Sequence, residues 1–458
     1  MTNKPKGRTT RKKTRAEFET VNPNAAGIDC GSGEHYVAVP ADRADNPVRV
    51  FPSFTADLHR LADWLIECDI DTVAIESTGV YWIPLFDILS ERGLEVIVVN
   101  ARHVKNVPGR KTDVVDCQWL QQLHTFGLLR GSFRPDLEIT QLRAYVRQRD
   151  TLVQSAADQT RRMQKALIQM NLQLHNVLSD ITGVTGLKIL RDIVAGQQDP
   201  KHLAQYRDRR CKATLEEIEA SLVGHYRPEH LFSLKQSLDL FDNYHDKIAE
   251  CDEQIEVVLN VLAAKQPTTD KAVAKRQTRN ARNTPKIKLA PLLLQMTGGH
   301  DLTAINSIDG YAALKIVSEI GIDMNRWPSE KHFASWATLA PQNKITGGKQ
   351  ISSKTPRSGN RVAALLRTCA ATQARANSAL GAFYRRLAYR KGKSKAIAAT
   401  ARKIAVMVYR VLAGKIDYKD PGADAYDNAH RERSIRALKR KADSLGLTIL
   451  EPAAAEVS

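Results

Sequence analysis

The chain has 458 residues, enough for two or three domains, and a formal net charge of +18. Its six cysteines are scattered without a CxxC pair or a Cys/His metal spacing, which argues against a disulfide framework and a zinc site. No stretch has the apolar length of a membrane span, and the first residues lack the apolar region of a secretory signal. The composition therefore predicts a soluble, cytoplasmic protein.

The positive charge is concentrated in two places. Seven basic residues precede the first acid, Glu17, so residues 1–19 are predicted to form a flexible basic arm. Residues 331–415 hold 18 lysines and arginines and no acid, whereas the rest of the chain has 50 basic and 50 acidic residues. An ordinary solvated face mixes both signs, so this window indicates a polyanionic partner bound through its phosphates. Nucleic acid is the expected partner.

Residues 20–130 alternate strand and helix patterns. Three strands are followed by helix, strand, helix, strand and helix, the order expected of an RNase H-like α/β layer. The predicted strands are 25–30, 35–40, 47–52, 72–76 and 95–99, and the predicted helices are 55–68, 82–92 and 113–125.

Four acids lie at the ends of these elements. Asp29 and Glu76 end apolar runs, and Asp113 and Asp116 share one face at the start of a helix. Any one of them alone is most simply a strand-end or helix-start acid. Together they suit hard divalent ions, which prefer oxygen ligands. Two such ions roughly 3.5–4 Å apart would clamp the attacking and leaving oxygens of a phosphodiester.

Residues 137–265 are predicted to be long helices. Apolar residues recur at four/three spacing in two coiled-coil-like series, the first interrupted by Arg149 and Thr160. An antiparallel hairpin that packs on itself and a dimer contact explain these series equally well. The series are Leu142, Val146, Val153, Ala156, Met163, Leu167, Met170 and Leu174, and Leu234, Leu238, Phe241, Ile248, Ile255 and Leu262.

The remaining chain divides into three parts. Residues 266–288 are polar and basic with two prolines, which predicts a linker. Residues 289–415 are predicted to form a mostly helical domain, and residues 416–458 a helical tail. In the domain, residues 307–320 resemble a helix–turn–helix hairpin with Gly310 making the turn, and residues 339–349 form a Gly-containing loop between helices.

Two separated regions resemble the IS110 family of transposases. The first 130 residues carry Gly27-Ile28-Asp29, Ala74-Ile75-Glu76-Ser77-Thr78-Gly79 and Lys111-Thr112-Asp113-Val114-Val115-Asp116, which are similar to the DEDD domain of that family. Residues 300–375, with Leu339-Ala340-Pro341 and Gly347-Gly348-Lys349, resemble its carboxy-terminal transposase domain. The motifs are specific in combination.

The resemblance implies a RuvC-like domain that binds Mg²⁺ or Mn²⁺ through Asp29, Glu76, Asp113 and Asp116. It also implies a nucleophile in the second domain, where the family usually carries a serine before the glycine of the loop. Here that position is Thr346, whose hydroxyl can act as a nucleophile but whose extra methyl restricts χ1. Ser352 and Ser353 are the alternatives. Without the resemblance, Thr346 is most simply a loop hydroxyl that satisfies a backbone group.

Further residues are candidates for contact with nucleic acid. Tyr81 and Trp82 could stack on a base, although aromatics at a helix start more often fill a core. The basic candidates beside the acids equally suit a solvated surface, and those after the loop suit phosphate binding or stabilisation of an oxyanion. These candidates are Arg110, Lys111, Lys349, Arg357, Asn360, Arg361, Arg385, Arg386, Arg390, Lys391, Lys393 and Lys395.

The resulting hypothesis is a DNA transposase that excises and inserts an insertion sequence through a covalent hydroxyl–DNA intermediate at Thr346. The family implies a structured guide RNA, a dimer or tetramer, and a place at the bacterial nucleoid. One alternative is a hydrolytic RuvC-like nuclease that uses the acids alone. Another is an actin-like sugar kinase, suggested by Gly27-Ile28-Asp29-Cys30-Gly31, but its second phosphate loop is missing. A third is an inactive relic that binds nucleic acid.

Overall fold

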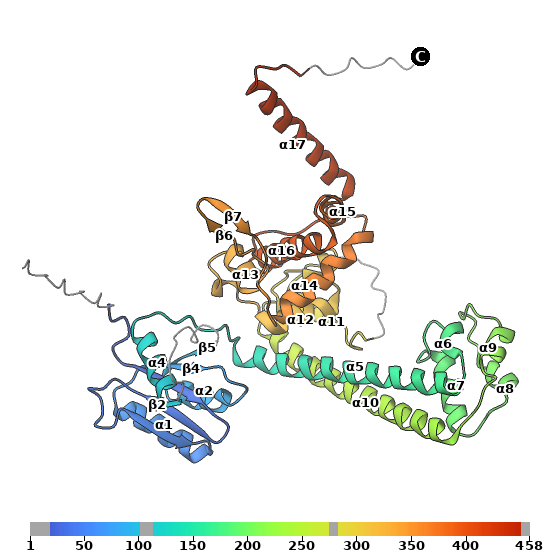
Figure 1. Ribbon diagram of the computed structural model, residues 1–458, viewed down its shortest axis with the longest axis horizontal. Coiled ribbons are helices and arrows are strands. Elements are labelled where there is room, and N and C mark those ends of the chain that lie inside the picture. The colour runs from blue at the N-terminus through green and yellow to red at the C-terminus, as the bar shows by residue number, and fades with distance from the viewer. Residues whose placement is uncertain (1–18, 101–112, 274–282, 450–458) are drawn as a thin grey trace, which may run out of the picture. The chain divides into compact units, whose positions relative to one another are not determined.

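The computed structural model describes residues 19–100, 113–273 and 283–449. The basic arm predicted for residues 1–19 lies outside the described residues, except for Glu19. Arg110 and Lys111 also lie outside the described residues. The chain separates into two compact units, residues 1–134 and 135–458 (Figure 1). The first is an α/β unit and the second is almost entirely helical.

The first unit is built on a five-stranded mixed sheet of order β3-β2-β1-β4-β5. β1 pairs with β2 antiparallel and with β4 parallel, and β4 pairs with β5 parallel. This is the strand order of an RNase H-like fold, and it confirms the α/β prediction. The elements are β1 (Ala25–Cys30), β2 (Glu34–Ala38), β3 (Val48–Pro52), α1 (Thr55–Glu67), β4 (Thr72–Glu76), α2 (Trp82–Glu91), β5 (Glu95–Val99) and α4 (Asp113–Thr125).

The sheet is covered on both faces. Alternate residues of β4 belong to different clusters, because successive side chains of a strand point to opposite faces. Val73 and Ile75 pack with the apolar residues of α1 and α2, whereas Ala74 packs with Leu120 of α4. Helices α1 and α2 therefore cover one face, and α4 covers the other.

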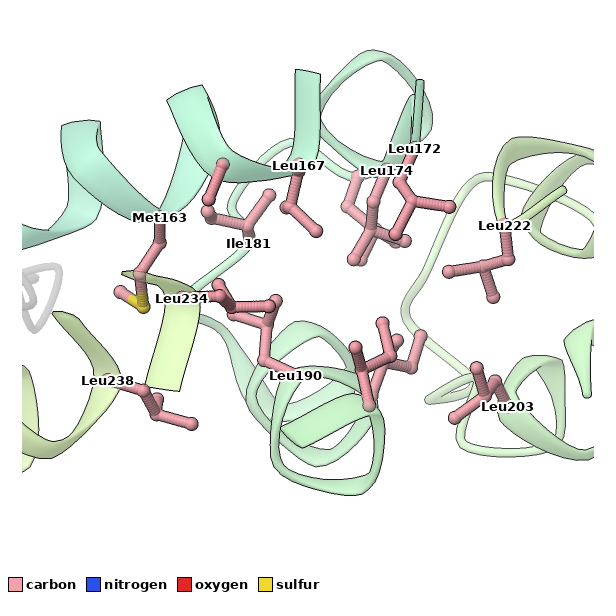
Figure 2. Packing of buried hydrophobic residues seen from close by; sticks show 14 of the residues in the cluster. Met163, Leu167, Leu172, Leu174, Ile181, Leu190, Leu203, Leu222, Leu234 and Leu238 are labelled. Atoms are coloured by element: carbon pink, nitrogen blue, oxygen red, sulfur yellow. The ribbon is translucent and has the colours of Figure 1, made fainter. Parts of the chain in front are cut away.

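The second unit begins with a long antiparallel hairpin of α5 (Leu137–Gln169) and α10 (Pro228–Ala264) (Figure 1). Both predicted apolar series are buried except for Val153, which is half-buried, and α5 packs against α10 within the chain, as the hairpin alternative predicts. In Figure 2, Met163 and Leu167 of α5 lie in the same cluster as Leu234 and Leu238 of α10. The cluster continues into the short helices at the tip, α6 (Leu174–Val177), α7 (Val184–Val194), α8 (Pro200–Ala204) and α9 (Leu215–Ser221).

Arg149, which interrupts the first series, is only 1% exposed and forms an ion pair with Asp252 across the hairpin. Its Nη1 also donates to the Asn283 carbonyl and to the Tyr311 hydroxyl, each at 2.9 Å. The hydroxyl of Tyr311 donates in turn to Asp150 at 2.6 Å. One guanidinium thus connects α5, α10, the segment that follows α10 and the first turn of α12 (Gly310–Ile320).

Replacing Arg149 by alanine is expected to lower the free energy of unfolding by about 3–5 kcal/mol, because the carboxylate of Asp252 would stay buried without its cation. Urea denaturation of the full chain followed by circular dichroism measures this loss. The control is Arg191→Ala, which breaks the exposed pair with Asp242 and should cost less than about 1 kcal/mol. Equal losses for the two variants would contradict the assignment.

Among the remaining elements, α16 contacts α13, α14 and α15, whereas α12 contacts α5 and α14, and α17 contacts α15. The hairpin of β6 and β7 stands between α13 and α14 in the chain. The elements are α11 (Leu289–Met296), η1 (Leu302–Ala304), α12 (Gly310–Ile320), η2 (Met324–Arg326), α13 (Glu330–Trp336), β6 (Lys344–Thr346), β7 (Lys349–Ser352), α14 (Arg361–Thr372), η3 (Gln373–Arg375), α15 (Ala379–Lys391), α16 (Lys393–Leu412) and α17 (Ala423–Asp443).

The turn predicted at Gly310 was wrong. Gly310 is the first residue of α12, and the left-handed conformation before this helix belongs to Ser307, with φ +81°. Asp309 is the N-cap residue, and its carboxylate accepts from the Ala312 N–H at 2.7 Å. The helix start is thus capped by its own chain. Among the described residues, no helix combines the length and apolar character needed to cross a membrane.

Candidate active site

A cavity of about 660 Å³ lies at one edge of the sheet in the first unit. Three of the four predicted acids line it, Asp29 from β1, Glu76 from β4 and Asp116 from α4. Glu34, at the start of β2, also lines it and was not among the predicted residues. The cavity thus gathers four carboxylates from four elements.

Strand register explains why Asp29 and Glu76 meet. β1 and β4 are parallel neighbours with Ile28 opposite Ile75, so the next residue in each strand lies at the same sheet edge. The run Ala25–Ile28 is fully buried, as expected of a central strand covered on both faces. The buried apolar run holds β1 in the centre of the sheet, and Asp29, which follows the run, lines the cavity.

Gly27 brings α4 close enough for Asp116 to reach the same cavity. A Cβ placed on Gly27 would lie 2.3 Å from the backbone nitrogen of Gln121 and 2.5 Å from the carbonyl oxygen of Cys117. Both atoms belong to the backbone of α4 and cannot move away without moving the helix. Glycine is therefore required where α4 crosses β1.

Gly27→Ala is expected to displace α4 and to lower the strand cleavage that the sequence predicts by about 10²-fold, since a misplacement of about 1 Å can cost that much. Gly33→Ala is the matched control, because Gly33 lines the same cavity but its Cβ would meet nothing within 4 Å. The cleavage rates of the two variants measure the effect. A Gly27→Ala variant as active as Gly33→Ala would refute this role.

Neighbouring thiols report the negative potential of the cavity. Burial raises the pKa of Cys30, and the carboxylates of Asp29 and Glu76 raise it further. Burial likewise raises the pKa of Cys117 to about 12, with Asp29 and Asp116 adding to the rise against a backbone hydrogen bond that lowers it. The pKa values of both thiols are thus raised by carboxylates that line the cavity, and Asp29 acts on both.

The donor chemistry of the cavity fits a divalent cation. Carboxylate oxygens are the ligands that Mg²⁺ prefers, and a cation would neutralise the repulsion among these acids. Among the described side chains, no three His, Cys, Asp or Glu residues already stand close enough to form a metal cluster. Asp113 begins α4 one turn before Asp116, but its side chain is outside the described part of the chain.

The two aromatic candidates near the acids differ in environment. Trp82 packs edge-on against Phe86, with ring centroids 6.0 Å apart, and lies beneath the guanidinium of Arg134. Tyr81 is 44% exposed. Trp82 is thus used within the fold, and Tyr81 is the one available for stacking.

Thr346 lies on a β-hairpin and not in an irregular loop, which corrects the prediction for residues 339–349. It ends β6 and pairs with Lys349 of β7 across the two-residue turn Gly347-Gly348. Both glycines have positive φ, +55° and +73°, as a type I′ turn requires. The whole turn is exposed, and Thr346 is exposed with it.

Gly348→Ala is expected to destabilise this hairpin by about 1–2 kcal/mol, the cost of placing alanine in the left-handed region. Faster amide hydrogen exchange in residues 344–352 is the measurement. Gly359→Ala is the control, since Gly359 lacks a positive φ and its Cβ would meet nothing within 4 Å. Unchanged exchange in Gly348→Ala would contradict the turn assignment.

The alternative hydroxyls lie further along the hairpin. Ser352 pairs with Lys344 at the open end, and its Oγ accepts from the Lys354 N–H at 3.4 Å. Ser353 follows it and lines a separate cavity. Of the three hydroxyls, only Thr346 is next to the turn.

The basic candidates fall into two groups. In the first, the side chain is engaged within the protein: Asn360 caps α14 by accepting from the Ala363 N–H at 2.9 Å. Arg385 donates to the Ala376 carbonyl at 2.7 Å, and Arg386 lies over the ring of Tyr426 and donates to its hydroxyl. The second group is exposed: Lys349, Arg357, Arg361, Arg390, Lys391, Lys393 and Lys395.

Two models of protein families match the chain, in regions that together include Asp29, Glu76, Asp113, Asp116 and Thr346. A DEDD-type model of the IS110 group, described as a transposase, matches residues 26–172. A model described as "Transposase IS116/IS110/IS902 family" matches residues 299–385. No curated protein matches the chain.

Proposed function

Because this chain belongs to the IS110 family of transposases, we propose that it excises and inserts an insertion sequence by metal-assisted cleavage and exchange of DNA strands. The observation that carries this proposal is the cavity where Asp29, Glu76 and Asp116 meet from three elements. A second catalytic group is proposed on the hairpin that bears Thr346.

In the first unit, the acids would hold Mg²⁺ or Mn²⁺ and orient the scissile phosphate. Asp29, Glu76 and Asp116, which line the cavity from three elements, would supply the oxygens, and we include Asp113, one turn before Asp116 in α4. When bound, the metal would supply Lewis-acid stabilisation of the phosphate oxygens. The chain's own part is to fix the geometry of this oxygen set.

In the second unit, the Oγ1 atom of Thr346 is the proposed nucleophile. Its attack on phosphorus forms a Thr–O–P bond and breaks one P–O bond to a sugar, which leaves as a hydroxyl with the proton from threonine. A hydroxyl of the exchanged strand then attacks the same phosphorus and releases Thr346. Bond energy is conserved, so no external energy source is needed for rejoining.

The resemblance extends the proposal to partners. Members of the family are guided by a structured RNA encoded by the element, and their two catalytic groups combine across subunits. We therefore propose a guide RNA and a dimer or tetramer for this chain, acting at the bacterial nucleoid. The exposed cations of residues 331–415 supply phosphate contacts for either nucleic acid.

A hydrolytic nuclease is the second candidate, because all the acids that line the cavity belong to the first unit. A nuclease would release nicked ends, whereas a transposase would rejoin them to new partners. The test incubates the full chain and its co-purifying RNA with Mg²⁺ and DNA that carries the element's junction. Recombined strands are the expected product. Metal-dependent nicks without any recombined strand would contradict the proposal.

A further inference from the structure

A cavity of about 780 Å³ lies in the second unit beside the Thr346 hairpin. Its walls come from the turn before the hairpin, the segment after β7, and helices α15 and α16. Ser353 and Lys354 of this wall directly follow the strand that pairs with β6. The cavity is thus connected through the hairpin backbone to the proposed nucleophile.

Four cations line this cavity, Lys354, Lys391, Lys395 and Arg402, and none of the described residues that line it is an acid. Among the ion pairs between described residues, none involves any of these four side chains. Like charges held around one hollow raise its potential and attract an anion. The cavity is therefore suited to phosphate groups.

One part of the cavity wall is apolar. Leu339, which is only 1% exposed, lies in its wall with Leu387, Ala398 and Ala399. Phosphate alone would gain nothing from such a surface, whereas the flat apolar face of a base would be removed from water there. The volume lies in the range of pockets that hold small organic ligands, which is ample for one nucleotide.

We propose that this cavity binds one unpaired nucleotide of a DNA or RNA strand, with its phosphates among the four cations and its base against the apolar wall. A duplex presents only its backbone to such a hollow, so the base must be unstacked. This inference rests on the proposed function, which identifies the bound polyanion as a nucleic acid. It adds a subsite at the open end of the hairpin that bears Thr346.

The test measures binding of the full chain to labelled oligothymidylate of about twelve nucleotides, and to the same sugar–phosphate chain without bases. Wild-type protein is expected to bind the strand with bases about fivefold or more tightly. Ala398→Phe fills the cavity without changing its charge and should abolish this preference. Ala437→Phe, at an exposed position of α17, is the matched control and should retain it.

A second pair of variants tests the phosphate contacts. The double variant Lys391→Gln, Lys395→Gln should reduce the steepness of the plot of log binding constant against log salt concentration. The slope should fall by about 0.7 for each lost cation. Lys439→Gln with Lys441→Gln removes the same charge from α17 and should leave the base preference intact. Oligouridylate provides the RNA arm, and the strand on which Ala398→Phe acts more strongly is the one assigned to the cavity.

Two results would overturn these proposals in different ways. If Ala398→Phe folds, as circular dichroism reports, yet keeps the base preference with both DNA and RNA, the cavity does not hold a base. If the wild-type chain binds neither type of strand, the proposed nucleic-acid function fails as well.

Discussion

Asp29→Asn is expected to lower the proposed strand cleavage by roughly 10²–10³-fold or more, because it removes one negative oxygen from the set proposed to hold the metal. Glu76→Gln should have a similar effect, since Glu76 ends the neighbouring parallel strand at the same sheet edge. Both substitutions keep the size of the side chain, so the fold should persist. Cleavage of junction DNA over a range of Mg²⁺ concentrations is the measurement.

Glu34→Gln is the matched control for these variants. Glu34 lines the same cavity, but its carboxylate accepts a hydrogen bond from the Tyr36 hydroxyl at 2.7 Å. We expect its activity to stay within about threefold of the wild type, because a glutamine can still accept this hydrogen bond and Glu34 is not among the proposed metal ligands. Loss of activity in Glu34→Gln with normal activity in Asp29→Asn would move the metal site away from the predicted acids.

Thr346→Ala is expected to abolish strand exchange, with a loss of about 10⁴-fold or more, because it removes the proposed nucleophilic oxygen. Thr346→Ser keeps that oxygen and removes the methyl that restricts χ1. Relief of a rotamer constraint of about 0.5–1.5 kcal/mol would raise the rate by about two- to tenfold. Formation of recombined DNA by each variant is the measurement.

Ser353→Ala and Ser352→Ala are the controls for the Thr346 variants. Ser352 lies at the open end of the hairpin, and Ser353 lies beyond β7. Both variants should therefore recombine DNA at close to the wild-type rate. If either were inactive while Thr346→Ala remained active, the nucleophile would belong to that serine.

The sequence was sufficient to predict the α/β unit because its signals are local. Buried strands such as Thr72–Glu76 appear as short apolar runs, and the acid at the end of each run is visible by position. The gathering of Asp29, Glu76 and Asp116 then follows from the strand order of an RNase H-like fold. Glu34 was missed because it begins its strand and no apolar run precedes it.

Other features depend on contacts that no local pattern records. Arg149 looked like an interruption of an apolar series, and only the packing of α5 on α10 provides Asp252 as its partner. The hairpin around Thr346 was predicted to be a loop, although a Gly-Gly pair between two short strand-like runs, which contain Ile345 and Ile351, is a recognised hairpin signal. The cavity beside it joins residues from Leu339 to Arg402, which lie far apart in the chain.

The central claim is that Thr346 forms a covalent bond to DNA. The most direct test incubates the full chain, its co-purifying RNA, Mg²⁺ and junction DNA, denatures the reaction, and maps any DNA-linked peptide by mass spectrometry. The result expected is an adduct on the peptide that contains Thr346, present in the wild type and absent in Asp29→Asn. Metal-dependent cleavage without any adduct, or an adduct on another residue, would contradict the account.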